Sequence, residues 1–114
     1  MDEISSVIIA AKALDGLSLR MTAIAQNLAN VNSPQYQSAR VDFEKALRGA
    51  TGSGLDAVRS LRFTFVADQS YGLGDDRRID LQIADAATTA SKYAALADMI
   101  GRRMAIQHAL VGGK

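Results

Sequence analysis

The chain has 114 residues and a formal net charge of +1, with 13 basic and 12 acidic side chains and no cysteine. This length fits a single domain, and the balanced charge gives no electrostatic reason to expect nucleic-acid binding. The absence of cysteine excludes disulfides, thiolate metal ligands and a cysteine nucleophile. Hydrophobic residues make up 48% of the chain but aromatic residues only 5%, so a compact globule would have a thin core. We therefore expect other chains to bury part of the apolar surface.

The first predicted element is a long amphipathic helix over residues 4–31, in which apolar residues recur in steps that sum to seven. Gly16 is a weak point in it, because glycine costs about 1 kcal/mol relative to alanine inside a helix. Ile9 and Leu19 lie outside the main stripe, so a second contact surface is expected. Leu17 and Ile24 widen the stripe. The predicted packing seam of this helix consists of Val7, Leu14, Met21 and Leu28.

A polar turn ends this helix, and we interpret it as an assembly motif. Its residues are Asn27, Asn30, Asn32, Ser33, Pro34 and Tyr36. Pro34 biases Ser33 away from helical geometry, and the asparagines favour turns. Asn27 and Asn30 lie on one helical turn, where their amides can bond a neighbouring helix or the turn itself. Tyr36 is expected to be a packing anchor with its hydroxyl on a partner or on water. The alternative, that Asn30 and Asn32 only cap and turn the chain, stays open.

The middle of the chain predicts less regular structure. A short helix is expected from Phe43, with Asp42 as its N-cap and Gly49 just past its end. Residues 49–78 are rich in glycine and are expected to be mostly loop. Within them residues 61–66 alternate with period two, which indicates one extended segment that could pair with a partner chain.

A second long helix is predicted to open near Asp80, as its N-cap, and to run to Val111. Its predicted packing seam consists of Ala90, Tyr93, Ala97, Ile100 and Met104. The expected fold class is mainly α, with the N- and C-terminal helices pairing as a coiled-coil-like hairpin around a short helix and a loop or extended middle. The corresponding segments are residues 1–33, 34–78 and 79–114. Heptad periodicity alone does not separate this arrangement from an ordinary two-helix hairpin inside one globule.

No catalytic or metal-binding constellation is predicted. His108, the sole histidine, lies near the end of the last helix, where a surface or packing role is expected. Asp85 and the pair at residues 75–76 lack histidine or cysteine at metal-ligand spacing. The glycine pairs at residues 52–54 and 72–74 lack the Gly-Lys-Ser/Thr sequence of a phosphate-binding loop. We therefore expect neither enzyme activity nor a cofactor or metal.

Membrane insertion is not expected either. No run approaches the roughly 20 apolar residues needed to span a bilayer. The acidic start, Met1-Asp2-Glu3, lacks the basic region of a secretory signal peptide. If the protein leaves the cytoplasm, another export route is expected to recognise it.

Three stretches of this sequence carry a resemblance to a known family. Residues 21–36, ending in Asn30-Val31-Asn32-Ser33-Pro34-Gln35-Tyr36, resemble the signature that ends the N-terminal helix of bacterial flagellar axial proteins. Residues 40–47 resemble the continuation typical of the proximal rod protein B family, and residues 79–104 resemble its C-terminal helix. Together the resemblance covers about residues 11–48 and 79–110. Gln35 stands where the family usually has glycine, so the geometry of this turn is left open.

The resemblance implies a structural subunit of the flagellar basal-body rod that self-assembles through its terminal helices into a tube and lies in the rod across the periplasm. It implies export through the flagellar type III gate. The implied partners are copies of itself, other rod proteins, the rod adaptor and inner-membrane ring proteins. Alternative interpretations are another axial component such as rod protein C, or a helical adaptor module unrelated to flagella.

Overall fold

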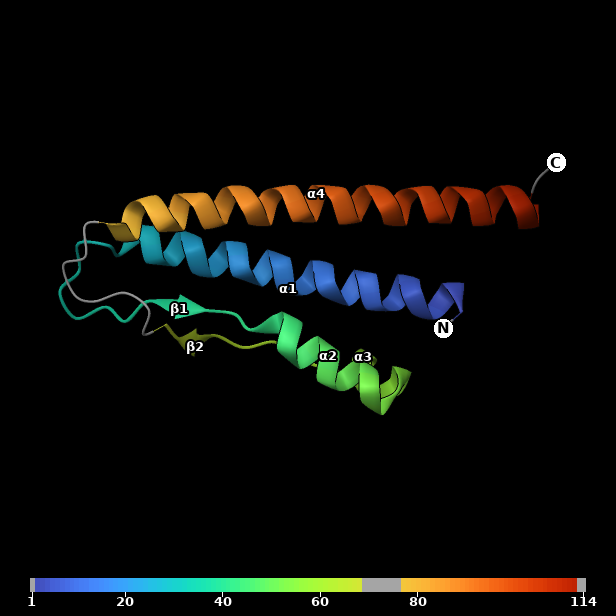
Figure 1. Ribbon diagram of the computed structural model, residues 1–114, viewed down its shortest axis with the longest axis horizontal. Helices are drawn as coiled ribbons and strands as arrows, with labels where there is room; N and C mark the ends of the chain where they lie inside the picture. The colour runs from blue at the N-terminus through green and yellow to red at the C-terminus, as the bar shows by residue number, and fades with distance from the viewer. Residues whose placement is uncertain (1, 69–76, 113–114) are drawn as a thin grey trace.

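Two long helices lie side by side along the length of the molecule (Figure 1). In the computed structural model, which describes residues 2–68 and 77–112, α1 spans Glu3–Ala29 and α4 spans Arg77–Gly112. They run in opposite directions, as a hairpin, and the molecule measures 60 × 29 × 15 Å. This pairing confirms the predicted mainly α fold with interacting terminal helices. No helix in the described part of the chain has the length and apolarity needed to cross a membrane.

The start of α1 is fixed by its cap. The Asp2 carboxylate accepts a hydrogen bond of 2.7 Å from the backbone N–H of Ser5, which satisfies one donor that the first helical turn leaves free. This bond lowers the pKa of Asp2. Glu3 adds a second negative charge at the positive end of the helix dipole. The helix therefore begins where local side-chain chemistry favours it.

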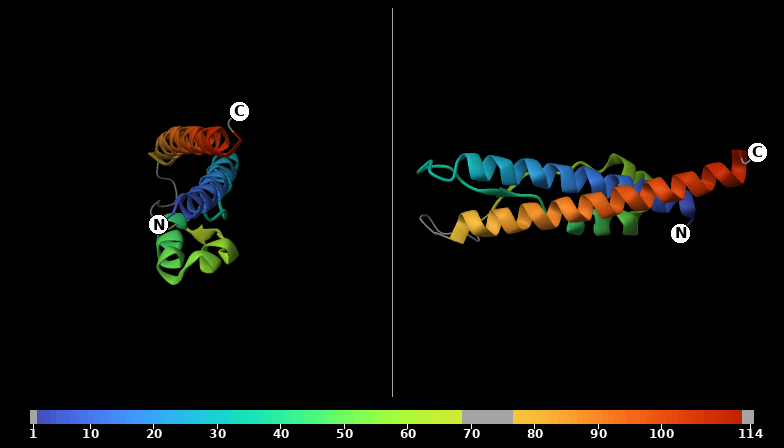
Figure 2. Two further views of the ribbon diagram at one scale, coloured as in Figure 1. Left: turned by 90° about the vertical axis from the view of Figure 1, so that its right-hand side faces the viewer. Right: turned by 90° about the horizontal axis from the view of Figure 1, so that it is seen from above.

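Residues 37–68 form a compact arm that packs on α1. The arm contains β1 (Ala39–Arg40), α2 (Phe43–Ser53), α3 (Leu55–Ser60) and β2 (Val66–Ala67). The two strands are antiparallel, with Ala39 opposite Ala67 and Arg40 opposite Val66. The helix α1 lies between α4 and the helices of the arm, as the views in Figure 1 and Figure 2 agree. The arm therefore covers a second side of α1, which accounts for the apolar Ile9 and Leu19 outside its main stripe.

The structure corrects several details of the middle segment. The helix that starts at Phe43 does not end before Gly49 but continues to Ser53, and α3 follows it directly. The break comes at Gly54, whose φ of 110° favours glycine. Asp42 occupies the N-cap position of α2 but makes no capping hydrogen bond. Val66, at the end of the period-two segment, belongs to β2 and pairs with β1 of the same chain.

The last helix also begins earlier than its sequence predicted. Arg77 is already helical, so Asp80 lies in the first turn and is not the N-cap. Its negative charge is still favourable there, because the first turn is the positive end of the helix dipole. The predicted loop residues 69–76, including the pair at residues 75–76, lie outside the described residues.

The core is small, as the composition predicts, and lies where α1 meets the arm. One cluster joins α1 to the arm, and Leu96 of α4 packs against it. Its buried members are Leu17, Ala23, Val41 and Phe43. The Phe43 ring meets Phe63 edge to face, with 5.8 Å between the ring centroids. Gly16 lets the helix approach Phe43, since an added Cβ would lie 2.3 Å from Cγ of that ring. The predicted weak point is thus the site of closest approach.

Candidate assembly interface

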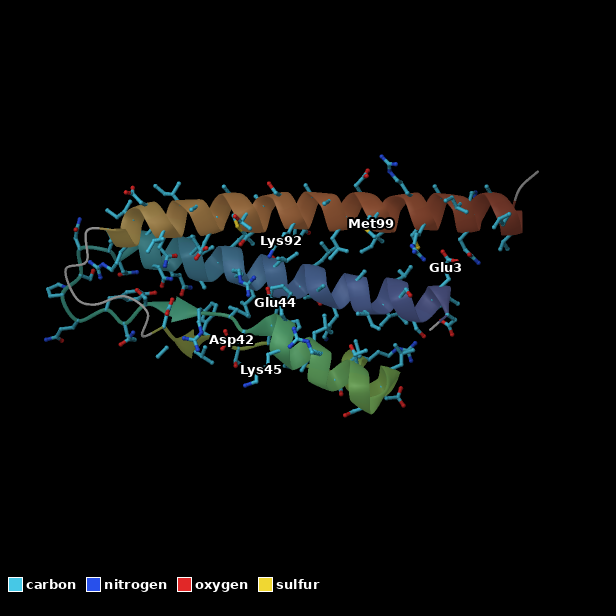
Figure 3. The ribbon with its side chains drawn as sticks, viewed as in Figure 1. Glu3, Asp42, Glu44, Lys45, Lys92 and Met99 are labelled. Atoms are coloured by element: carbon cyan, nitrogen blue, oxygen red, sulfur yellow. The ribbon has the colours of Figure 1, made fainter. Side chains whose placement is uncertain are left out.

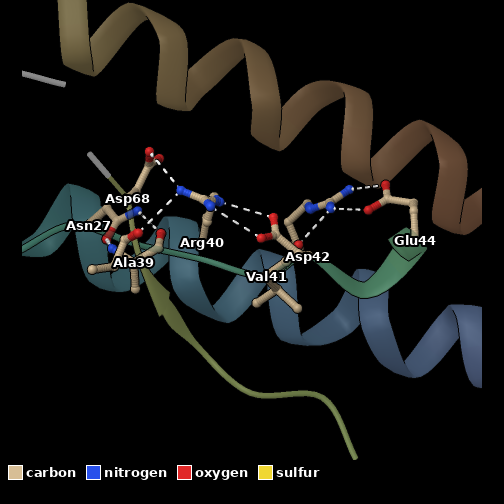
Figure 4. Close-up of polar contacts among 9 residues, drawn as sticks. Asn27, Ala39, Arg40, Val41, Asp42, Glu44 and Asp68 are labelled. Atoms are coloured by element: carbon tan, nitrogen blue, oxygen red, sulfur yellow. Dashed lines mark hydrogen bonds and ion pairs between the residues drawn. The ribbon is translucent and has the colours of Figure 1, made fainter. Parts of the chain in front are cut away.

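The turn motif is organised around the buried side chain of Asn27, which is 4% exposed. Its Nδ2 donates to the carbonyl of Ala39 at 2.8 Å, and its Oδ1 accepts from the N–H of Ala39 at 2.9 Å (Figure 4). The side-chain amide therefore binds both backbone groups of a β1 residue, as a neighbouring strand would. This contact fixes the start of the arm against the last turns of α1.

The remaining hydrogen-bonding capacity of Asn27 is also used within the chain. The Tyr36 hydroxyl donates to its Oδ1 at 3.1 Å, and Nδ2 donates to Oε1 of Gln82 on α4 at 3.3 Å. Both donors and both lone-pair positions of the amide are thus occupied. The expectation that the Tyr36 hydroxyl rests on a partner or on water is wrong. No feature of the sequence pattern singles out Gln82, a polar residue that is 5% exposed on a helix rich in alanine.

The other motif residues shape the turn locally. Asn30 donates from its side chain to the carbonyl of Gln26 at 2.9 Å and accepts from the N–H of Ser33 at its own carbonyl, also at 2.9 Å. Asn32, Ser33 and Pro34 are exposed. In the described part of the chain no residue other than glycine has a positive φ, so the turn at Gln35 forms without left-handed backbone. Asn30 therefore has the capping and turning role that the sequence left open.

A second polar cluster holds α2 against α1. The Arg20 guanidinium donates to both carboxylate oxygens of Glu44, at 2.7 and 2.5 Å, and to the carbonyl of Val41 at 2.7 Å. It also lies 4.5 Å from the centroid of the Phe43 ring. Hydrogen bonding to Arg20 is the main cause that lowers the pKa of Glu44. Arg20 thus joins a charge pair, a backbone group and the core aromatic at one point.

The strand pair has its own cation. Arg40 donates to both oxygens of Asp42, at 3.0 and 3.2 Å, and to the carbonyl of Ala67 at 3.2 Å (Figure 4). It lies 3.7 Å from the carboxylate of Asp68, which is 7% exposed. Hydrogen bonding to Arg40 is the largest cause that lowers the pKa of Asp42. Each of these groups therefore has a bonding role inside the arm.

The structure places the predicted packing seam at the edge of the helix pair. Met21, Tyr93 and Met104 are 36%, 41% and 57% exposed. None of the nine seam residues is buried, and all but Met21, Ala90, Tyr93 and Met104 are half-buried. Leu17 and Ile24, which widened the predicted stripe, are instead 3% and 6% exposed. The packing face of α1 is therefore rotated from the heptad seam toward this neighbouring column, which leaves the seam partly open.

Large apolar side chains remain exposed along both helices and are densest on α4. In the described residues of α4 they are Ile79, Leu81, Ile83, Tyr93, Met99, Met104, Ile106, Leu110 and Val111. Figure 3 shows α4 with only one flank against α1, and its last turns extend beyond the start of α1. These exposed apolar residues are gathered along one helix, where burial against another surface would be favourable. Within residues 2–68 and 77–112 no group of three or more histidine, aspartate or glutamate residues could hold a metal ion.

A long helical hairpin with a small docked arm and open apolar flanks defines a class of protein, the elongated helical hairpin. The chain is 47% identical over 58 residues to the flagellar basal body rod protein FlgB of Borrelia hermsii. The match covers 47% of this chain and 43% of that protein, so the chain matches less than half the length of this curated relative. No family model matches the chain. The match confirms the resemblance to the rod protein B family over about half of the sequence.

Two further residues at the helix contacts escaped the sequence analysis. The contact of Arg20 leaves no signal in the local sequence pattern, because its partner Glu44 is 24 positions away in sequence. Gly16 was taken as a defect, although a glycine inside a helical pattern often signals close packing, and this signal could have been used. The contacts of Arg20 and Gly16 form because the arm folds back onto α1. Helical periodicity carries no information about the path of the arm.

Proposed function

We propose that this chain is a structural subunit of the bacterial flagellar basal-body rod, without enzymatic activity. The observation that carries the proposal is the run of exposed apolar residues on α4, of which Leu110 and Val111 are each 78% exposed. Burying apolar surface contributes about 25 cal/mol per Å², so a helix of this length with an open flank favours association. The similarity to a basal-body rod protein supports assigning that association to the rod.

The physical argument for a continuous assembly rests on where these residues lie. They occupy different flanks of α4, so a contact through one flank leaves another available. Contacts between unlike surfaces of identical subunits extend as helical arrays when they do not close. We expect the terminal helices to supply these contacts in a tubular axial structure, and the last turns of α4 to become ordered most strongly on assembly.

The finer parts of the proposal come from the resemblance. The partners are copies of this chain, other flagellar rod proteins, the rod adaptor and inner-membrane ring proteins. During secretion the chain would pass the flagellar type III export gate. The motif residues Asn32, Ser33 and Pro34 are exposed at one end of the hairpin, where a neighbouring subunit could contact them.

The test is to tag the chain in its own bacterium, purify basal bodies and locate the tag by electron microscopy. We expect one labelled layer in the proximal rod and loss of motility when the gene is deleted, with recovery on complementation. A label in a different axial layer would favour the rod protein C alternative. Intact, unlabelled basal bodies together with normal motility of the deletion strain would overturn the proposal and favour an unrelated adaptor.

A further inference from the structure

On the side away from the arm, exposed side chains of α1 and α4 border the line along which the two helices meet, which we call the groove. The arm contacts α1 through Lys12, Gly16 and Arg20, which recur every four residues and so share one face of the helix. On another face the residues are exposed and recur at helical spacing, namely Ile4, Ala11, Asp15, Ser18, Thr22, Ala25 and Ala29. The partly open seam of α1 borders this face.

The α4 side of the groove is the column of residues 83, 90, 97 and 104, spaced seven apart. Ile83 and Met104 are 54% and 57% exposed, and Ala90 between them is also exposed. Asp85, Thr88 and Lys92 line a cleft together with residues of the arm, so they mark the opposite flank of α4. At one end the groove deepens into a mostly apolar hollow of about 260 Å³, lined by Ile4, Val7, Ile8 and Met104 among others.

Acidic residues border this groove on both helices. On α1 the charged residue of the exposed face is Asp15. On α4, Asp80 lies three residues before Ile83, and Asp98 lies eight residues after Ala90. At these spacings both aspartates lie beside the column of residues 83, 90, 97 and 104. A helix that fits here needs an apolar stripe beside basic side chains.

The C-terminal half of α4 presents such a stripe on its other flank. Met99 and Ile106 follow Lys92 at intervals of seven, and Leu110 lies four residues further. The three apolar residues are 54%, 59% and 78% exposed. Arg102 lies between Met99 and Ile106 and keeps its side chain 77% exposed while it pairs with Asp98 at 2.9 Å. An exposed pair of this kind is weak, so Arg102 can exchange it for a neighbour's carboxylate.

We propose that the groove between α1 and α4 receives the C-terminal half of α4 from a second copy of this chain. This inference rests on the proposed function and names the partner of the hairpin's open face. The receiving groove and the inserted stripe lie on different flanks of α4. Each copy can therefore receive a helix in its groove and insert its own stripe into another copy at the same time. The contact is therefore heterologous and extends from copy to copy.

Cysteine cross-linking of the purified full-length protein tests this contact, because the natural chain has no cysteine. One preparation carries Ala90→Cys in the groove and another carries Ile106→Cys in the stripe. We expect mild oxidation of the mixture to join them about tenfold faster than it joins Ile106→Cys to the control Asp56→Cys on α3. Far-ultraviolet circular dichroism of each variant verifies that the helices are intact.

Charge reversal provides a second test of the same contact. Asp15→Lys with Asp80→Lys in the receiving copy should lower the cross-linking rate about threefold, as should Arg102→Glu in the inserting copy. Combining the altered copies should restore the rate, which a merely structural effect would not do. Rates equal to the Asp56 control, or a dominant Ala90-to-Ala90 product, would overturn the proposal. If this occurred while the chain was found in basal bodies, another axial protein would occupy the groove and the proposed function would stand.

Discussion

Asn27 binds both backbone groups of Ala39, with 2.8 Å from its Nδ2 to the carbonyl and 2.9 Å from the amide N–H to its Oδ1. The side chain of Asn27 thereby pairs with β1 as the backbone of a neighbouring strand would. The same side chain reaches Gln82 of α4, so three separate segments meet at one buried amide.

Replacing Asn27 should therefore destabilise the whole molecule. Asn27→Leu leaves the N–H and carbonyl of Ala39 and the Tyr36 hydroxyl without this partner, and each buried polar group left unpaired costs about 1–3 kcal/mol. We expect a loss of about 2–4 kcal/mol in the free energy of unfolding, measured by urea denaturation followed by circular dichroism. The control Asn30→Ala removes only two local bonds, to Gln26 and Ser33, at a half-buried position and should cost less than about 1 kcal/mol. Equal losses in both variants would contradict the role of Asn27.

Gly16→Ala tests whether packing outweighs helix propensity. Alanine favours the helix by about 1 kcal/mol, but its Cβ would lie 2.3 Å from Cγ of Phe43. Overpacking of this kind costs about 1–3 kcal/mol, so we expect a net loss of stability. At Gly49, also helical, a Cβ meets nothing within 4 Å, and Gly49→Ala should stabilise the protein. Thermal denaturation of the two variants should give shifts of opposite sign.

Leu17→Ala and Leu110→Ala make one chemical change in two environments. Leu17 is 3% exposed in the core cluster, whereas Leu110 is 78% exposed near the end of α4. We expect the first to lower the free energy of unfolding by about 2–5 kcal/mol and the second to leave that of the monomer nearly unchanged. The measurement is chemical denaturation at a concentration where light scattering shows a monomer. A large loss for Leu110→Ala under that condition would mean that a contact already covers it.

The pair of Arg20 and Glu44 predicts a small acid-dependent loss of stability. Because the folded state lowers the pKa of Glu44, the charged carboxylate contributes stability above the pKa that Glu44 has in the unfolded chain. This contribution is lost as the pH falls from about 4.3 through the lower folded pKa. The Glu44 side chain is 44% exposed, so we expect less than about 1 kcal/mol. Glu44→Gln should flatten this part of the curve of unfolding free energy against pH.

The pKa of Asp42 is also lowered in the folded protein, mainly by its hydrogen bond to Arg40. The acid part of the curve of unfolding free energy against pH should therefore be compared between Glu44→Gln and Asp42→Asn. If Arg20 and Glu44 couple, the difference between wild type and Glu44→Gln should disappear in the background of Arg20→Met. A difference that persists without Arg20 would assign the pH dependence to another group.

Sequence periodicity alone determined the two long helices and their pairing, because apolar spacing near 3.6 residues reports a helix wherever its partner lies. It also indicated the end of α1 at the polar turn. Tertiary structure decided which column of α1 is buried: the arm draws Gly16 onto Phe43, the core forms around Leu17, and the predicted seam is left partly open. It also decided that Asn27 serves contacts within the chain. These outcomes depend on residues far apart in sequence, whose meeting is set by packing and hydrogen-bond satisfaction rather than by local pattern.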